Sequence, residues 1–317
     1  MLTGKRIFIT GGCGFIGTAL ARRLIEHNEV VLFDNMYRGV SGHLTHANLR
    51  IDKGDVLDAE AVAKSMSGAN MVVHLAAIAG VDTVLKMPVT TMKVGLLGTL
   101  HMLEAALLQP AMERVIDFST SEVFGSYAYN VHEGDLTPMG AVGTARWTYA
   151  VSKLASEHLA INYHKEFGLP TLSIRPFNIY GPGQVGDGAI RSFVVRAVRN
   201  EDLVIHNDGS QIRAWCYIDD IVDAILLCLE NPASVGHALN IGNPRSVVTV
   251  YQLAKLVQRL CDTTSKIVFE KREQVDVALR VPNIEKARQL LGFEPLVDIE
   301  EGIVRTFEFY RNQAAVS

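Results

Sequence analysis

Short hydrophobic runs alternate with longer segments of helical periodicity through the first half of the chain. The runs predict buried β-strands at Arg6–Thr10, Val30–Asp34, Asn48–Lys53, Met71–Leu75, Arg114–Phe118 and Thr171–Arg175. Between them, apolar residues recur at helical spacing, which predicts one helix after the first strand and others that begin near Asp58, after Pro88 and around Tyr149. This alternation indicates an α/β fold built on a doubly wound parallel sheet, the Rossmann arrangement.

Beyond residue 179 the alternation loosens and the elements become shorter. The sequence predicts a helix over Ala189–Arg199, a strand at Leu203–His206, a short segment at Gly209–Arg213, a loop at Arg280–Asn283 and a mostly helical tail from Val250. These elements indicate a smaller C-terminal α/β lobe.

The division of the chain follows from this change of pattern. We expect a dinucleotide-binding domain over residues 1–178, to which residues 214–242 return, because they again read as a strand-end segment, an apolar helix and a strand. Residues 179–213 and 243–317 then form the smaller lobe, which is expected to bind the substrate.

Composition narrows the range of partners. The chain has 317 residues, of which 48% are hydrophobic, enough for a large core. Its formal net charge of −4, without a basic run, gives no electrostatic reason to expect nucleic acid or an anionic membrane as a partner. No apolar run approaches the roughly 20 residues that span a bilayer, and no leader pattern precedes the first strand. The four cysteines lack disulfide or zinc spacing, so we expect reduced thiols and a cytoplasmic location.

A glycine-rich loop follows the first strand at once, and a helical pattern follows the loop. Within it, Gly11 would permit a tight turn, Gly14 the close approach of a pyrophosphate, and Gly17 close packing of helix on strand. The N-terminus of the helix would then face the phosphates. Glycine spacing alone is a weak signal, but a strand before it and a helix after it are the context that a dinucleotide-binding loop requires.

An acidic residue ends the next strand. Asp34 lies about twenty residues beyond the loop, where a carboxylate accepts hydrogen bonds from both hydroxyls of an adenine ribose. The carboxylate would repel a 2′-phosphate, which favours NAD over NADP, although the nearby Arg38 keeps NADP open and Asp34 also suits a turn. The other residues predicted to contact the cofactor are Phe15, Ile16, Asn35, Asp55, Val56, Leu75, Ala76 and Ala77.

Tyr149 and Lys153 lie about one helical turn apart and therefore on one face of a helix. A tyrosine of pKa about 10 needs roughly 4 kcal/mol of preferential stabilisation to ionise near pH 7, and a neighbouring lysine supplies part of it. Upstream, Thr120 and Ser121 offer hydroxyls and Glu122 a carboxyl for proton transfer. The spacing alone also suits an ordinary surface pair.

Polar residues further along suit an anionic substrate. Arg191, Arg213 and Arg280 are candidates to bind a second pyrophosphate, since arginine makes bidentate contacts with phosphate oxygens, although each alone is also typical of a surface. Asn178, in a loop rich in Pro and Gly, suits either a ligand contact or a turn.

Two histidines, His43 and His46, have no accompanying acids or cysteines in a ligand pattern. We therefore predict no metal site.

The assembled motifs resemble the extended short-chain dehydrogenase/reductase superfamily, specifically its NAD-dependent nucleotide-sugar epimerases, dehydratases and decarboxylases. The resemblance covers nearly the whole chain and rests on Thr10-Gly-Gly-Cys-Gly-Phe-Ile-Gly17, Asp34, Gly54-Asp-Val56, His74-Leu-Ala-Ala77, Ser119-Thr-Ser-Glu122, Tyr149 with Lys153, Arg175-Pro-Phe-Asn-Ile-Tyr-Gly-Pro182 and Arg213-Ala-Trp-Cys-Tyr-Ile-Asp-Asp220. One departure is Gly95, where relatives often carry Asn; it is expected to loosen that helix without removing a catalytic group.

The resemblance implies roles for these residues. Tyr149 would take the proton from a sugar hydroxyl, usually at C4, while NAD accepts the hydride. Lys153 would hold Tyr149 and the nicotinamide ribose, and Thr120 would bind the same hydroxyl. The nucleotide-sugar would contact Ser121, Asn178, Arg191, Arg213 and Arg280. Relatives also form dimers through the helix over 96–108 and the Tyr149 helix, which implies a homodimer.

Glu122 bears on the fate of the 4-keto intermediate, because ordinary 4-epimerases of this superfamily usually lack an acid there. Its Thr-Ser-Glu sequence resembles GDP-mannose 4,6-dehydratases and UDP-glucuronate decarboxylases. The run Arg146-Trp-Thr-Tyr149 and the Arg-x-Pro motif at Arg280, which matches an arginine of the decarboxylase pocket, are closer to the decarboxylases. We therefore expect a UDP-glucuronate decarboxylase-like enzyme, with 4-epimerisation and 4,6-dehydration as alternatives. A non-catalytic dinucleotide-binding regulator is the alternative of another class.

Overall fold

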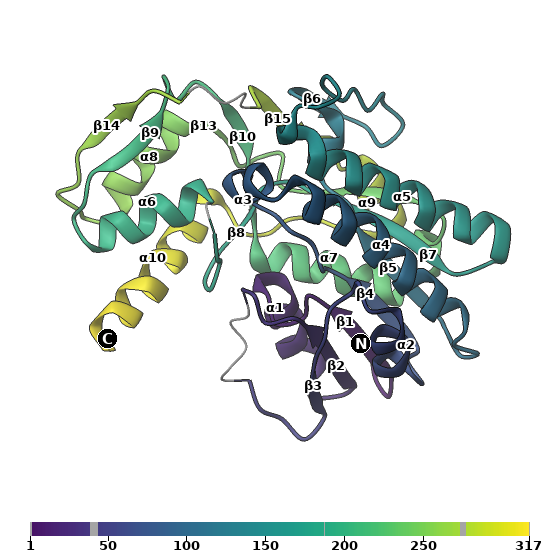
Figure 1. Ribbon diagram of the computed structural model, residues 1–317. Helices are drawn as coiled ribbons and strands as arrows, with labels where there is room; N and C mark the ends of the chain where they lie inside the picture. Colours follow the sequence, from purple (N-terminus) through teal and green to yellow (C-terminus); the bar gives the residue numbers. More distant parts are fainter. Residues whose placement is uncertain (1, 39–43, 187, 273–276, 317) are drawn as a thin grey trace.

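The computed structural model describes residues 2–38, 44–186, 188–272 and 277–316. Its centre is a sheet of parallel strands with helices on both faces (Figure 1). From edge to edge the strands are β12 (Ala238–Ile241), β7 (Thr171–Pro176), β5 (Arg114–Phe118), β4 (Met71–His74), β1 (Arg6–Thr10), β2 (Glu29–Asp34) and β3 (Leu49–Lys53). The predicted doubly wound parallel sheet is confirmed.

Two hydrophobic cores form because successive side chains of a strand point to opposite faces. In β1, Ile7 and Ile9 belong to one core and Phe8 to the other, and all three are fully buried. Each such burial contributes roughly 1.5–3 kcal/mol. The first core is covered by α1 (Phe15–Leu24) and α7 (Ile218–Glu230), and the second by α2 (Ala59–Met66), α4 (Pro88–Leu107) and α5 (Thr148–Phe167).

The edge strand β3 differs from the prediction. Asn48–Lys53 was expected to be buried, but the side chains of Arg50 and Ile51 are exposed, Ile51 to 40%. Among the described residues β3 pairs only with β2, so it lacks the cover that the central strands receive.

A second sheet lies beyond the first and joins distant parts of the chain. Its order is β13 (Val247–Thr249), β10 (Ile212–Ala214), β15 (Leu279–Pro282) and β6 (Tyr127–Val131). The loop predicted at Arg280–Asn283 is therefore wrong, because its first residues form a strand that pairs with both β6 and β10. Pro282 ends that strand, a position where its missing N–H is tolerated.

The remaining elements form short connections and a group of helices toward the C-terminus. The short elements are α3 (Val81–Lys86), η1 (Ser121–Phe124), η2 (Ala145–Trp147), β8 (Ile179–Tyr180), β11 (Cys216–Tyr217) and η3 (Pro232–Ser234). The others are α6 (Ala189–Val198), β9 (Leu203–His206), α8 (Val250–Leu260), β14 (Ile267–Glu270), α9 (Glu285–Leu291) and α10 (Ile299–Val316). Figure 1 shows α6, α8 and α10 together with β9 and β14, apart from the β1 to β3 edge.

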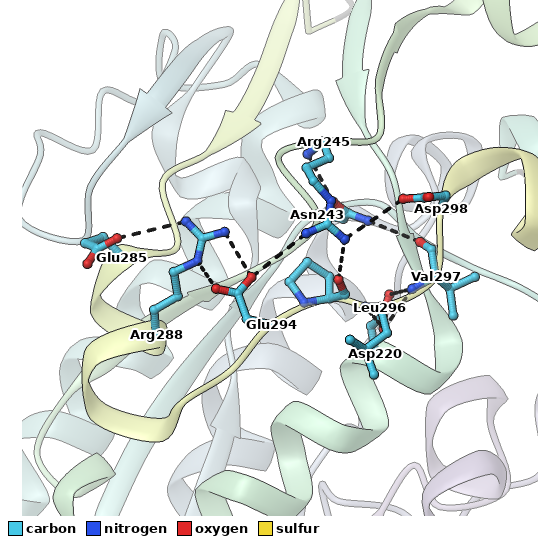
Figure 2. Close-up of polar contacts among 10 residues, drawn as sticks. Asp220, Asn243, Arg245, Glu285, Arg288, Glu294, Leu296, Val297 and Asp298 are labelled. Carbon is cyan, nitrogen blue, oxygen red and sulfur yellow. Dashed lines mark hydrogen bonds and ion pairs between the residues drawn. The ribbon is translucent and has the colours of Figure 1, made fainter.

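Polar contacts fasten the segment before α10 to α7 and to the loop after β12 (Figure 2). The buried carboxylate of Asp220, in the first turn of α7, accepts the backbone N–H groups of Leu296 at 2.7 Å and Val297 at 3.4 Å. Asn243 donates to the Val297 carbonyl at 3.1 Å. Burial raises the pKa of Asp220 to about 6 despite these two donors. The C-terminal elements are thus joined to the main sheet through a buried acid.

Within the described part of the chain, none of the helices combines the length and the apolar character needed to cross a membrane.

Candidate active site

The glycine loop lies at the carboxyl edge of the sheet, where the strand order reverses between β1 and β4. Ligands of doubly wound sheets bind at this point. Gly11 has a φ of +63°, and a Cβ there would lie 2.8 Å from the backbone N of Ala76. A Cβ on Gly17 would lie 2.6 Å from the carbonyl oxygen of Gly12. At both glycines, neighbouring backbone atoms occupy the space that a side chain would need. The loop can therefore turn tightly at the start of α1, the shape that a phosphate-binding loop requires.

Asp34 ends β2 beside this loop. Its Oδ2 accepts the N–H of Cys13 at 3.0 Å, and its Oδ1 accepts the N–H of Met36 at 2.8 Å. Arg38 instead donates to the carbonyl of Ala79 at 2.8 Å and to Thr83 Oγ1 at 2.5 Å. The acid thus lies at the loop, while the arginine is tied to the segment around α3.

The other residues predicted to contact the cofactor lie at ends of the same strands. Phe15 and Ile16 begin α1, and Asn35 follows β2. Asp55 and Val56 follow β3, and the Asp55 carboxylate accepts the N–H of Leu57 at 3.0 Å. Residues 75–77 follow β4 and pack against the glycine loop. These positions agree with a cofactor at the switch point, and the individual contacts remain predictions.

Thr120 connects the end of β5 to Tyr149. Its Oγ1 accepts the N–H of Glu122 at 3.2 Å, which caps η1 and leaves the hydroxyl proton for another acceptor. A hydrogen bond between the Thr120 and Tyr149 side chains lowers the pKa of the phenol. Ser121 is buried in the same short helix.

The net effect on Tyr149 is opposite to the prediction. Burial is the main cause that raises the pKa of its phenol, and the negative charges of Glu122 and Asp117 raise it further. Lys153 does lie on the same face of α5, but its Nζ is 3.8 Å from Oδ1 of Asp117 on β5. Both side chains of that pair are buried. The lysine thus faces a carboxyl group whose pKa is raised by burial and lowered in part by the lysine charge, and the pKa of Tyr149 lies above its ordinary value.

Glu122 lies among positive charges. Arg146 donates from Nη1 to its Oε2 at 2.6 Å and from Nη2 to its Oε1 at 3.3 Å, and Arg280 Nη1 lies 3.7 Å from Oε1. Burial raises the pKa of Glu122, but the charges of Arg280, Arg146 and Arg213, with the Arg146 hydrogen bond, lower it overall. The carboxyl predicted for proton transfer is therefore an anion, able to accept a proton rather than to donate one.

The three candidate arginines do not lie together: two are on paired strands of the second sheet, and the third is on a helix. Arg213 and Arg280 are directly paired in register on β10 and β15, and both are buried. Arg191 is on α6, where it donates to the carbonyl of Gly186 at 3.3 Å and lies over the ring of Tyr310. Arg213 and Arg280 thus belong to the charges around Glu122, whereas Arg191 contacts α10.

Asn178 takes the turn role. It has a positive φ of 41°, and its Nδ2 donates to the carbonyl of Ala214 at 2.8 Å. This bond joins the loop after β7 to β10. A ligand contact by Asn178 remains a prediction.

Three residues of the site were missed. Arg146 entered the sequence analysis only as part of the run Arg146-Trp-Thr-Tyr149, and its bond to Glu122, 24 residues earlier in the chain, was not predicted. Asp117 is an acid inside an otherwise apolar strand, and an acid at such a position signals a buried partner. His74 bonds Thr10 at 2.7 Å through Nδ1, and burial with the Lys153 charge lowers its pKa to about 3, so it is neutral.

Among the described residues, no group of three or more His, Cys, Asp or Glu side chains could hold a metal ion. His46 is described and lies near Glu26, whereas His43 falls outside the described residues.

Comparison with known proteins places this geometry in context. Residues 7–242 match the model of the NAD dependent epimerase/dehydratase family. The UDP-N-acetyl-alpha-D-glucosaminuronate decarboxylase of Bacillus cytotoxicus is 33% identical, across 97% of this chain and 98% of its own length. UDP-glucuronic acid decarboxylase 1 of Xenopus tropicalis is 31% identical, across 98% of this chain and 73% of its own length.

A solved structure shares the fold over almost its full length. The UDP-glucuronic acid 4-epimerase of Bacillus cereus, solved in complex with UDP-glucuronic acid and NAD, matches with a TM-score of 0.88 and 26% identity. The match covers 97% of this chain and 99% of that one.

Proposed function

This chain belongs to the NAD dependent epimerase/dehydratase family, and from that premise we propose that it is an NAD-dependent decarboxylase of UDP-glucuronate. The cofactor is NAD, in keeping with the family and with a solved relative that holds it. The glycine loop and Asp34 have the shape and charge that its pyrophosphate and adenine ribose require. Relatives that decarboxylate two UDP-hexuronates support the choice of reaction.

The guanidinium groups around Glu122 carry the proposal. The Glu122 carboxylate lies among those of Arg146, Arg213 and Arg280. This cluster lies near Tyr149, since the charge of Glu122 raises the pKa of the Tyr149 phenol. A substrate carboxylate would find binding groups here, because arginine binds carboxylates in bidentate geometry. A neutral hexose has no carboxylate to make such contacts. A nucleotide-linked hexuronate therefore suits the site better than a nucleotide-linked hexose.

The reaction follows from these positions. NAD, held by the glycine loop and Asp34, would supply the acceptor for the hydride of C4 and the donor that restores it. Tyr149 must first lose the proton that burial favours in this state. As phenolate it then accepts the proton of the C4 hydroxyl, and Thr120 donates a hydrogen bond that favours the phenolate. The C5–C6 bond then breaks, carbon dioxide leaves, and its electron pair moves into the C4 carbonyl. A proton added at C5 and the Tyr149 proton returned to the C4 oxygen give a UDP-pentose.

A 4-epimerase of UDP-glucuronate is the second candidate. The same arginines would hold its substrate carboxylate, and a solved relative has that activity. The two reactions share the oxidation by Tyr149 and differ only in the fate of the C5–C6 bond.

Mass spectrometry of the product separates these outcomes. Purified protein with NAD and UDP-glucuronate should release carbon dioxide and form UDP-pentose, while the matched neutral substrate UDP-glucose should give little product. A new isomer of unchanged mass would identify an epimerase, and loss of water a dehydratase. If UDP-glucuronate, UDP-glucose, GDP-mannose and dTDP-glucose all remain unchanged while NAD binds, the chain is a dinucleotide-binding protein and the enzymatic proposal fails.

The assembly and location are further parts of the proposal. Apolar side chains remain exposed on the paired helices α4 and α5 and directly after α4: Leu97 to 39%, Leu108 to 75% and Phe167 to 52%. A homodimer through these helices would cover these side chains. Light scattering would test it, with wild type expected at the mass of a dimer and Leu108→Glu at that of a monomer.

All four cysteines lie buried as thiols, which supports the cytoplasm as the location.

A further inference from the structure

Asp117 is a buried acid for which the proposed reaction has no role. It lies in β5 between Ile116 and Phe118, and its side chain has no exposed surface. Ser173 on β7 donates to its Oδ2 at 3.2 Å. Its Oδ1 accepts no hydrogen bond from the described residues but lies 3.8 Å from the ammonium of Lys153. An apolar side chain would fill such a place at much lower cost, because a buried carboxylate needs a partner.

The surroundings of Asp117 single out Lys153 as that partner. On β4 the residue in register is His74, which is neutral. On the facing helix α5, Tyr149, Lys153 and Glu157 follow each other at one-turn spacing, so they share one face.

The acid of this helix has its own partner. Glu157 receives hydrogen bonds from Nη2 and Nε of Arg175 on β7, the shortest at 2.6 Å. Two buried ion pairs thus join α5 to the sheet. In one the helix supplies the positive charge, and in the other it supplies the negative charge. The positive charge opposite Asp117 is that of Lys153.

We propose that Asp117 is the counter-ion of Lys153, a positioning residue that holds the lysine behind Tyr149 and sets the pH at which the Tyr149–Lys153 pair loses its first proton. The part that concerns Tyr149 rests on the proposed function. Asp117 does not contact the reacting atoms; it acts through Lys153. Lys153 and Tyr149 share one face of α5, one turn apart, so a charge that Asp117 holds at Lys153 lies on the side of the helix that carries the phenol.

The direction of the effect follows from charge. With Asp117 ionised, its negative charge favours the protonated forms of both Lys153 and Tyr149. Without it, the pair carries one uncompensated positive charge in a buried place, and either proton leaves more readily. Because the two groups interact, the first loss belongs to the pair rather than to one residue. Removal of the carboxylate should therefore lower the first apparent pKa of the pair.

The ion pair is tested without any substrate. Protein labelled with 13C at the lysine Cε is titrated by NMR, and the Lys153 signal is assigned by its loss in Lys153→Met. In Asp117→Asn we expect the Lys153 signal to titrate at least about one pH unit lower than in wild type. Ser173→Ala, which removes the hydrogen bond to Asp117 but keeps its charge, is the matched control and should titrate close to wild type.

The same variants then test the link to Tyr149. The acid limb of the pH profile of UDP-glucuronate turnover should move to lower pH in Asp117→Asn but not in Ser173→Ala. Asp117→Leu replaces the charged group by an apolar side chain of similar size. It should shift both the Lys153 titration and the acid limb in the same direction as Asp117→Asn. It takes the place of Asp117→Asn if that variant fails to fold.

Each outcome decides a separate point. An unchanged Lys153 titration in folded Asp117→Asn or Asp117→Leu overturns the counter-ion role. A shifted Lys153 titration with an unchanged acid limb overturns the effect on Tyr149. If wild type converts no substrate, the proposed function fails, while the NMR titration still decides whether Asp117 holds the lysine charge.

Discussion

Arg146 donates to both carboxylate oxygens of Glu122, at 2.6 and 3.3 Å, from a position three residues before Tyr149. The pair joins η1, which follows β5, to η2, which leads into α5. Its two side chains are largely buried, and Arg280 approaches the same carboxylate. The two elements that carry Thr120 and Tyr149 are therefore held together by a bidentate ion pair.

Glu122→Gln should leave the oxidation at C4 intact and slow the step after it. Glu122 and the substrate carboxylate compete for Arg146 and Arg280. The arginines therefore bind the substrate carboxylate less tightly, and that carboxylate must leave as neutral carbon dioxide. Without this competition the ground state is bound more tightly than the transition state, so both KM and kcat should fall. We expect turnover to fall about tenfold for each 1.4 kcal/mol by which the ground state is bound more tightly, while NADH still forms in the site and absorbs at 340 nm.

Arg146→Lys separates charge from geometry in the same pair. Lysine keeps the positive charge but lacks the planar fork that bonds both oxygens of Glu122. The variant should fold with η1 less well fixed and lose less turnover than Glu122→Gln. Full wild-type kcat and KM in Glu122→Gln would remove Glu122 from the mechanism.

Tyr149→Phe should abolish NADH formation when protein, NAD and UDP-glucuronate are mixed. The ring remains to fill the buried site, but the oxygen that accepts the C4 proton and the hydrogen bond of Thr120 is lost. We expect a decrease of roughly 100- to 10,000-fold, the range of general base catalysis. The check is stopped-flow absorbance at 340 nm, with Tyr163→Phe, on the outer part of the same helix, as the matched control. Full activity in Tyr149→Phe would contradict its assignment.

The glycine loop and the Tyr149–Lys153 spacing could be predicted because backbone geometry imposes them locally. Gly11 needs a positive φ, and one helical turn places Lys153 beside Tyr149 whatever else surrounds them. The parallel direction of the strands also follows from the alternation of strands and helices. Local sequence was sufficient wherever the constraint itself was local.

Features that depend on distant partners were less predictable. The strand character of Leu279–Pro282 comes from β6 and β10, which precede it by long stretches of chain. The raised pKa of Tyr149 comes first from burial and then from the charges of Glu122 and Asp117, all of which are set by packing and not by spacing. From the sequence, Lys153 alone was expected to lower the pKa of Tyr149, which is the opposite direction.

Asp34 should make the protein prefer NAD to NADP. Its carboxylate lies at the glycine loop, while Arg38 is tied to Ala79 and Thr83 and is not positioned beside Asp34 to balance a 2′-phosphate. We expect NADH to bind roughly 10-fold or more tightly than NADPH, a difference of about 1.4 kcal/mol. Asp34→Ser should reduce this preference, and Arg38→Gln, as a control, should leave it largely unchanged. Fluorescence titration measures both affinities; tighter binding of NADPH by wild type would refute the assignment.

Gly95→Ala should destabilise the protein, although alanine favours helices. Gly95 is in α4, where a Cβ would lie 2.5 Å from Oγ of Ser152 on α5, and its carbonyl accepts hydrogen bonds from Thr99 and Ser156 at 2.7 Å each. The missing side chain thus permits close packing of the two helices, contrary to the expectation that it loosens α4. Overpacking of this kind costs about 1–3 kcal/mol, which urea unfolding would measure.

The matched control for that change is Gly134→Ala, since a Cβ there would meet nothing within 4 Å. It should alter the free energy of unfolding by less than about 0.5 kcal/mol. Ser152→Gly in the Gly95→Ala background should recover part of the loss, after correction for the effect of Ser152→Gly alone. Equal stability of Gly95→Ala and wild type would show that α4 and α5 adjust without cost.

Asp220 should make the stability of the fold fall as pH rises through the weakly acidic range. Its pKa is raised from 3.8 to about 6 by burial, so between these values the folded state keeps a proton that the unfolded state has released. By linkage, the fold then loses about 3 kcal/mol of stability between about pH 4 and pH 7 through this group alone.

Asp220→Asn cannot ionise but keeps an oxygen to accept the Leu296 and Val297 N–H groups shown in Figure 2. The stability of wild type relative to Asp220→Asn should therefore decline over this range, as measured by urea unfolding at a series of pH values. Glu166→Gln, an exposed acid near the end of α5, is the control. A constant difference between wild type and Asp220→Asn would mean that the two backbone donors stabilise the carboxylate enough to cancel its burial.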